Sequence, residues 1–206
     1  MSASVGPLRR VTPFFLLTFF LLPHAVGSTE LQISVPRTQA GVMVDGVLSA
    51  DEWKKAARVT VPGKVNLYFQ ESGEFVDIAV EYTGAPSGMV DMYLSPRKGD
   101  IYDLHASAKL GERAMSEHGF PDWRWWNNQD WTANVSRVDS FDTKTFLPTR
   151  VREFQIRRSR FGTMTWRVRF ELTAQNAHND TPWVIDFPEG TTASSTDGWL
   201  RLNLNQ

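Results

Sequence analysis

A ten-residue stretch, DWRWWNNQDW at residues 122–131, holds four of the chain's eight tryptophans. Indole rings stack on the apolar faces of sugar rings, and amide or guanidinium groups can replace the water that sugar hydroxyls lose on binding. Large exposed apolar surface usually marks a contact site. We therefore predict a carbohydrate-binding platform built from Trp123, Arg124, Trp125, Trp126, Asn127, Asn128 and Trp131.

The same tryptophans could instead form the edge of a core or a contact with another protein. If residues 122–126 are extended, Trp123 and Trp125 share one face and Trp126 lies on the other, so that one face would be buried. Trp131 opens an alternating run and could pack inward. Trp183, in the turn-rich segment NDTPWVID, is a further candidate for ligand contact.

Motifs for catalysis are absent from the sequence. There is no nucleophile elbow, no His-Glu-x-x-His pattern and no phosphate-binding loop. Asp122 and Asp130 flank the tryptophans and are the pair to consider for glycoside hydrolysis, a reaction defined by the separation of two carboxylates in space. We expect a non-catalytic binding protein rather than a small hydrolase or a structural partner of one.

Aspartates recur in the segments between the expected strands. Their carboxylates are the hard oxygen ligands that calcium prefers, although loop aspartates also cap turns. None falls in a spaced calcium loop such as an EF-hand. The candidates for a structural calcium site are Asp45, Asp100, Asp103, Asp139 and Asp142.

The first 27 residues have the three parts of a secretory signal. Arg9 and Arg10 precede the apolar run VTPFFLLTFFLL at residues 11–22, and small residues follow at 25–27. The run is shorter than the ~20 apolar residues that span a bilayer. We therefore predict a cleaved signal peptide over 1–27, one domain over 28–206, a secreted or periplasmic location and no stable membrane anchor after cleavage.

Composition narrows the remaining classes of partner. The chain has no cysteine, which excludes disulfides, zinc-thiolate sites and covalently attached haem. Without the signal, 20 basic residues face 23 acidic ones, so the net charge moves from -1 to -3. Nothing in that balance attracts a polyanion, and we expect no nucleic-acid partner.

Short runs with a two-residue period dominate the chain after residue 31. They are separated by glycine and proline, as hairpin connections require. The runs are 65–69, 75–82, 88–95, 131–138, 164–172 and 199–204. This pattern predicts an all-β, antiparallel β-sandwich of immunoglobulin-like or jelly-roll-like type. One short helix is expected near 50–57, with Ser49 and Glu52 forming a capping box.

Several segments resemble family 9 carbohydrate-binding modules and their DOMON-like relatives. They are VDGVLSADEWKKAA near the N-terminus, MVDMYLSPRKGDIYDLHASAKLGE at 89–112, MTWRVRFEL and the closing WLRLNLNQ. The resemblance implies a β-sandwich, a glycan ligand held by tryptophans, structural calcium and a role in support of carbohydrate catabolism. Its DOMON-like side implies the alternative of an electron-transfer domain with b-type haem. Met89 or Met92 would then pair with His105 or His118, although we expect no haem.

Overall fold

A computed structural model of the chain describes ten ranges of the sequence. They are residues 30–39, 41–63, 65–84, 88–125, 130–135, 137–138, 146–147, 149–162, 164–176 and 179–205. The predicted signal peptide lies outside these residues. Within them, no helix has both the length and the apolar character needed to cross a membrane.

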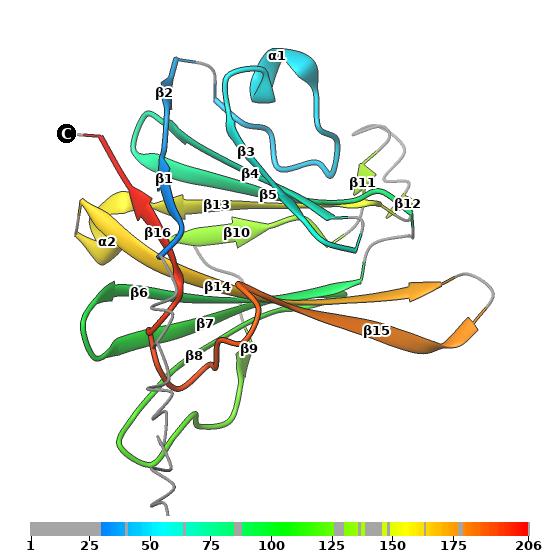
Figure 1. Cartoon of the computed structure of the whole chain (residues 1–206). Coiled ribbons are helices and arrows are strands. Elements are labelled where there is room, and N and C mark those ends of the chain that lie inside the picture. The colour runs from blue at the N-terminus through cyan, green and yellow to red at the C-terminus, as the bar shows by residue number, and fades with distance from the viewer. Residues whose placement is uncertain are drawn as a thin grey trace, which may run out of the picture.

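Two β-sheets face each other and form a sandwich (Figure 1). The larger sheet has the strand order β1 (Gln32–Ser34), β16 (Leu200–Asn203), β14 (Thr165–Asn176), β6 (Met89–Arg97), β7 (Asp100–Ala106), β8 (Leu110–Ala114) and β9 (Arg124–Trp125). In addition, β15 (Asn179–Phe187) pairs with β14 and forms a hairpin that projects from one end of the sandwich (Figure 1).

The second sheet has the strand order β10 (Trp131–Ala133), β13 (Val151–Arg157), β5 (Phe75–Tyr82), β4 (Val65–Ser72) and β2 (Arg37–Thr38). In addition, β3 (Ala57–Val61) pairs with β4, and the short strands β11 (Arg137–Val138) and β12 (Phe146–Leu147) pair with each other. The predicted all-β sandwich is therefore confirmed. It is not wholly antiparallel, because β1 pairs with β16 and β2 with β4 in the parallel direction.

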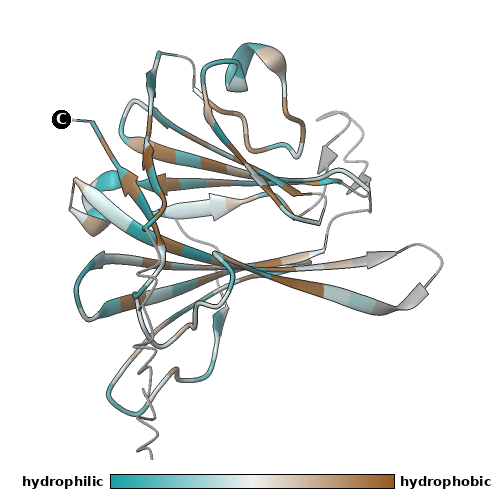
Figure 2. Ribbon diagram, in the orientation of Figure 1, coloured by the Kyte–Doolittle hydropathy of each residue, from teal (hydrophilic) through white to brown (hydrophobic). Residues whose placement is uncertain are grey.

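The core lies between the sheets and follows the two-residue period of the sequence. In β5 the apolar side chains of this core include Val76, Ile78 and Val80, and in β14 they include Val168 and Phe170. Hydrophobic residues accordingly colour the central strands of both sheets (Figure 2). Each strand of the larger sheet thus has one face committed to the core and one face that looks outward.

The predicted helix is present but shorter than expected. The helix α1 spans Ala50–Trp53, and the Ser49 side chain makes no capping hydrogen bond. The carboxylate of Glu52 accepts a hydrogen bond from the Met43 backbone N–H at 3.2 Å instead, so the capping-box prediction is wrong. Trp53 is buried and donates its indole N–H to Glu153 at 3.0 Å, which fixes the helix on the outer side of the second sheet.

A second helix, α2 (Arg158–Phe161), was not predicted and lies beside the C-terminal strand. Arg158 Nη1 lies 2.7 Å from the carboxylate of Glu71, which is fully buried. The same carboxylate accepts the backbone N–H of Asn205 at 2.6 Å. A buried ion pair therefore ties β4, α2 and the end of the chain together.

Candidate functional site

The outward face of the larger sheet carries polar side chains where the inward face carries core. Val90, Met92 and Leu94 of β6 point into the core, so Asp91 and Tyr93 lie on the outer face. Both are nevertheless almost fully buried, and so are the polar residues of β7 beside them. Burying a polar group costs free energy unless it finds a hydrogen-bonding or charged partner. The covered polar side chains on this outer face must therefore be paired with specific neighbours.

Trp123 and Trp125 cover one end of this face by lying over Gly111. Strand β9 pairs with β8 so that Gly111 faces Trp125. A Cβ atom on Gly111 would lie only 3.1 Å from Cε3 of each indole, so the glycine leaves the space that the rings occupy. The two ring centroids are 6.0 Å apart with an interplanar angle of 26°. This stack confirms the prediction that Trp123 and Trp125 share one face.

His105 packs beside the two indoles and is held by two hydrogen bonds. Its ring centroid lies 5.0 Å from Trp123 and 6.0 Å from Trp125. Nδ1 lies 2.6 Å from the Asp91 carboxylate on β6, and Nε2 lies 2.8 Å from the Ser107 hydroxyl. The imidazole is thereby fixed in orientation and supports the tryptophans from the side of β7.

Arg113 also contacts Trp123. Its guanidinium carbon lies 4.0 Å from the Trp123 ring centroid and 4.8 Å from that of Phe120. Arg113 Nε donates to Asp103 Oδ2 at 2.8 Å. Burial raises the pKa of Asp103 to about 7, with the nearby Asp91 charge acting in the same direction and Arg113 opposing it.

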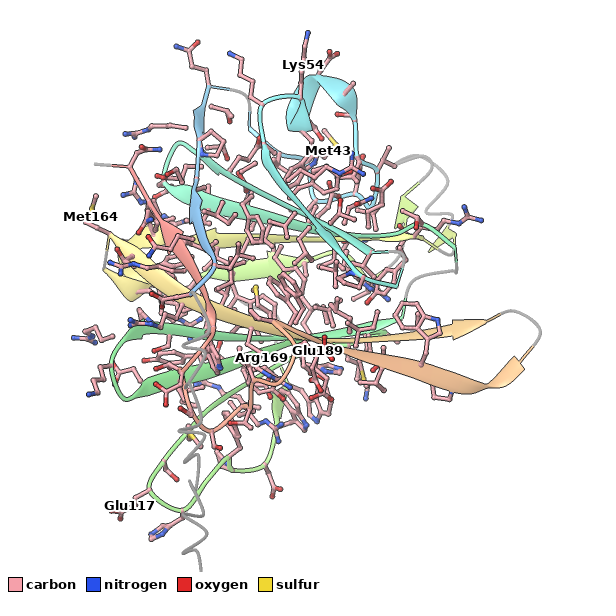
Figure 3. The ribbon with its side chains drawn as sticks, viewed as in Figure 1. Met43, Lys54, Glu117, Met164, Arg169 and Glu189 are labelled. Atoms are coloured by element: carbon pink, nitrogen blue, oxygen red, sulfur yellow. The ribbon has the colours of Figure 1, made fainter. Side chains whose placement is uncertain are left out.

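The polar side chains of this outer face form a row across the sheet. In the strand register, Arg113 lies opposite Asp103, Asp103 opposite Tyr93, and Tyr93 opposite Arg169 on β14. Arg169 lies on the side of the larger sheet that faces away from the second sheet (Figure 3). Its guanidinium carbon is 5.0 Å from the Tyr93 ring centroid, and it forms ion pairs with Asp186 and Glu171. Burial raises the pKa of Glu171. Arg169 Nη1 lies 3.7 Å from the Glu171 carboxylate, and Nε has no hydrogen-bond partner among the described residues.

The accessible end of the row is the indole of Trp125. It is 54% exposed, and the ammonium group of Lys109 lies 5.5 Å from its ring centroid. Trp123 beside it is half-buried. An exposed aromatic face that continues into hydrogen-bonding side chains can bind a molecule with one apolar face and a polar rim.

The structure separates Trp131 and Trp183 from this pair. Trp131 is 1% exposed, stacks on Phe154 at 6.2 Å and donates its indole N–H to Glu112 at 2.8 Å. It faces the core because the chain leaves the larger sheet after β9 and joins the second sheet at β10. Trp183 is half-buried and packs on the core beside Tyr82, with ring centroids 5.9 Å apart.

Of the other residues predicted to contact a sugar, the structure describes only Arg124. Arg124 is exposed and lies opposite Glu112 on β8, on the other side of β9 from the stacked indoles. Trp126, Asn127 and Asn128 fall outside the described residues. The platform that the structure describes therefore consists of Trp123 and Trp125 and their supports.

The aspartates predicted to bind calcium do not come together where they are described. Asp45 accepts a hydrogen bond from the Val47 backbone at 2.9 Å, and Asp100 pairs with Arg97 at 3.1 Å. Asp103 is paired with Arg113. The described part of the chain contains no group of three or more acidic or histidine side chains suited to a metal ion. Asp139 and Asp142 lie outside the described residues.

Of the residues considered for haem, Met92 and His105 lie on opposite faces of the sheet and cannot share an axial site. The Met92 side chain is in the core, whereas His105 is on the outer face of the sheet. Both ring nitrogens of His105 are engaged by Asp91 and Ser107, so neither is free to bind iron in this arrangement. His118 lies exposed in the connection between β8 and β9.

Sequence reasoning missed several residues that build this face. They are Asp91, His105, Gly111, Arg113 and Arg169 as supports of the tryptophans or as members of the polar row. The segment DIYDLHA carried a usable signal, because Asp103 and His105 alternate with Tyr102 and Leu104. A strand with acidic and histidine side chains on its second face is typical of a sheet that has a polar outer surface.

No model of a known protein family matches the chain, and no curated protein matches it in sequence. Solved structures do match its fold. One is a Bacteroides uniformis protein provisionally named as carbohydrate-binding, with a TM-score of 0.55 and 11% identity over 86% of this chain and all of the other.

Two further matches are a family 9 carbohydrate-binding module from Caldicellulosiruptor kristjanssonii. The complex with cellotriose has a TM-score of 0.51 and 8% identity, and covers 84% of this chain and 93% of the module. The complex with glucose has a TM-score of 0.53 and 11% identity, and covers 84% and 95%. The chain therefore shares the fold of these modules. These matches lend no support to the DOMON-like side of the resemblance.

Proposed function

We propose that this chain is a carbohydrate-binding domain whose ligand stacks on Trp125. The observation that carries the proposal is the nearly parallel pair of the exposed Trp125 and the half-buried Trp123 at the end of a buried polar row. One pyranose ring would lie against the outer indole, and its hydroxyls would meet side chains at the ring edge. The fold of modules solved with cellotriose and glucose supports this choice of ligand class.

The geometry of the supports favours a preformed site. Gly111 gives the rings room, while His105 and Arg113 both contact Trp123. Each support is itself tied to an aspartate, so neither can move freely when the ligand binds. A platform fixed before binding loses less conformational entropy when it binds, which favours affinity.

The experiment compares Trp125→Ala with Trp131→Ala in glycan binding and thermal stability. Losing one well-stacked aromatic costs about 1–3 kcal/mol by analogy with base stacking, a loss of about fivefold to more than a hundredfold in affinity. Truncation of the buried Trp131 should cost ~3–5 kcal/mol of unfolding free energy. Trp125→Ala should thus lose binding while its melting temperature stays close to that of the unaltered protein.

Val184→Ala is the matched control for exposed apolar surface. Val184 is 57% exposed, close to the exposure of Trp125, but lies on the projecting β14–β15 hairpin. It should change neither affinity nor melting temperature. Failure of the unaltered protein to bind a panel of soluble and insoluble glycans would refute the proposal, and so would undiminished binding by Trp125→Ala.

The proposal extends to export and to a role in carbohydrate catabolism. Both rest on the signal-like residues 1–27 and on the glycan ligand rather than on the described structure. A structural calcium ion remains a prediction for Asp139 and Asp142, outside the described residues. A protein that meets polysaccharide outside the cytoplasm would hold the polymer near the enzymes that degrade it.

A further inference from the structure

Ser107, His105 and Asp91 form a continuous hydrogen-bonded chain at the edge of the platform. Asp91 Oδ1 lies 2.6 Å from His105 Nδ1, and His105 Nε2 lies 2.8 Å from Ser107 Oγ. The carboxylate meets one imidazole nitrogen and the hydroxyl meets the other. This is the order of contacts that activates a serine nucleophile in hydrolases of unrelated fold, where the site is recognised by geometry rather than by sequence position.

The burial of the three groups also suits that chemistry. Asp91 and His105 are each 7% exposed, whereas Ser107 is half-buried at the end of β7. A buried carboxylate holds the imidazole in one tautomer, and an accessible hydroxyl can meet a substrate. The exposed Trp125 ring lies 6.0 Å from His105 and provides a flat surface beside the hydroxyl.

We infer that Ser107 is a nucleophile toward carboxylic esters, with His105 as its general base and Asp91 as the group that orients His105. Ser107 Oγ would attack the ester carbonyl carbon while its proton passes to His105 Nε2. The C–O bond to the alcohol then breaks, and His105 returns the proton to the departing alkoxide oxygen. Water hydrolyses the resulting acyl-serine by the same route, releasing the acid and restoring the hydroxyl.

The nearest backbone donor that could turn toward a developing oxyanion is the N–H of Lys109, which in this structure donates to Ser107 Oγ. This N–H is 3.4 Å from Ser107 Oγ, in the turn that the Ser107 N–H closes on the Lys109 carbonyl at 3.0 Å. Loss of one oxyanion donor in a well-built site reduces turnover by about 10²–10³-fold. With a single backbone donor identified among the described residues, turnover should be slow and an acyl-serine should accumulate.

The test uses the full-length protein with 4-nitrophenyl acetate and, separately, with a fluorophosphonate probe. The expected results are a burst of 4-nitrophenol approaching one equivalent and a phosphonyl adduct that peptide mass spectrometry places on Ser107. Ser107→Ala should abolish both, and His105→Gln should reduce the labelling rate at least tenfold.

Ser194→Ala is the matched control for the loss of a serine hydroxyl. Ser194 is exposed, and its hydroxyl lies 3.4 Å from the hydroxyl of Thr192, which cannot serve as a general base at neutral pH. The same substitution at this position should therefore keep both the burst and the adduct on Ser107.

Two outcomes would overturn the inference. One is the absence of any adduct on the folded, unaltered protein, and the other is equal labelling of Ser107→Ala. Because the probes contain no sugar, a failure to bind glycans would refute the proposed function without affecting this test. Conversely, glycan binding with an unreactive Ser107 would leave a binding domain in which the three residues only position Trp123.

Discussion

Gly111→Ala adds a single methyl group beneath the stacked indoles and tests how the platform is held. The new carbon would lie 3.1 Å from Cε3 of both Trp123 and Trp125, and 3.2 Å from Cζ3 of Trp125. Carbon atoms pack best about 3.5–4.0 Å apart, so both rings must rise by several tenths of an ångström. Rings already half-open to solvent can do so, but their stack and their contact with His105 will change.

The stability change should be small. Overpacking costs about 1–3 kcal/mol in a closed core. Here the rings can move outward toward solvent. In addition, alanine reduces the conformational entropy of the unfolded chain, and at a position that needs no positive φ this stabilises the folded state by about 0.4–1 kcal/mol. We therefore expect the unfolding free energy to change by less than about 1 kcal/mol, while glycan affinity falls about tenfold, or about 1.4 kcal/mol.

The assay combines circular dichroism, urea unfolding and glycan titration. Two stacked indoles give an exciton couplet, whose amplitude should drop in Gly111→Ala even without ligand. Gly41→Ala is the control, since its Cβ would meet nothing within 4 Å. An unchanged couplet together with unchanged affinity would show that the rings do not rest on Gly111 in solution.

Three further predictions concern stability and processing. The Asp103 carboxyl keeps its proton up to about pH 7 when folded but has an ordinary pKa of 3.8 when unfolded, so stability should fall as pH rises from about 4 to 7. Three pKa units correspond to at most about 4 kcal/mol, and Asp103→Asn should flatten this slope in urea unfolding at several pH values. Arg158→Met should cost ~3–5 kcal/mol of unfolding free energy by leaving the buried Glu71 charge unpaired, and a loss below about 1 kcal/mol would contradict the ion pair. N-terminal sequencing of the exported protein should begin at Ser28, and retention of Arg9 and Arg10 would exclude cleavage.

Much of the fold could be predicted because the alternation of side chains is local. The segment 75–82 was predicted as a strand and is β5 with the same bounds. Strands β7, β8 and β13 were not among the predicted runs, since their polar residues interrupt a simple apolar alternation. Those polar residues are buried by tertiary contacts, as with Glu153 and Asp103, and a local pattern cannot show such partners.

The candidate site was only partly predictable for the same reason. The two-residue period places Trp123 and Trp125 on one face if the segment is extended, and the pairing of β9 with β8 makes it so. The same period says nothing about Trp131, because the chain changes sheets before reaching it. The register of β10 on β13 pairs Trp131 with Ile156 and turns its indole into the core.

The sequence by itself determined the sandwich class, the absence of thiol chemistry and the pairing of two tryptophans on one side of a strand. These properties depend on composition and on neighbours a few residues apart. Only the tertiary structure decided that the pair rests on Gly111, and that His105 and Arg113 support it. It also brought Asp91 of β6 to His105 of β7, because strand register joins side chains that lie far apart along the chain.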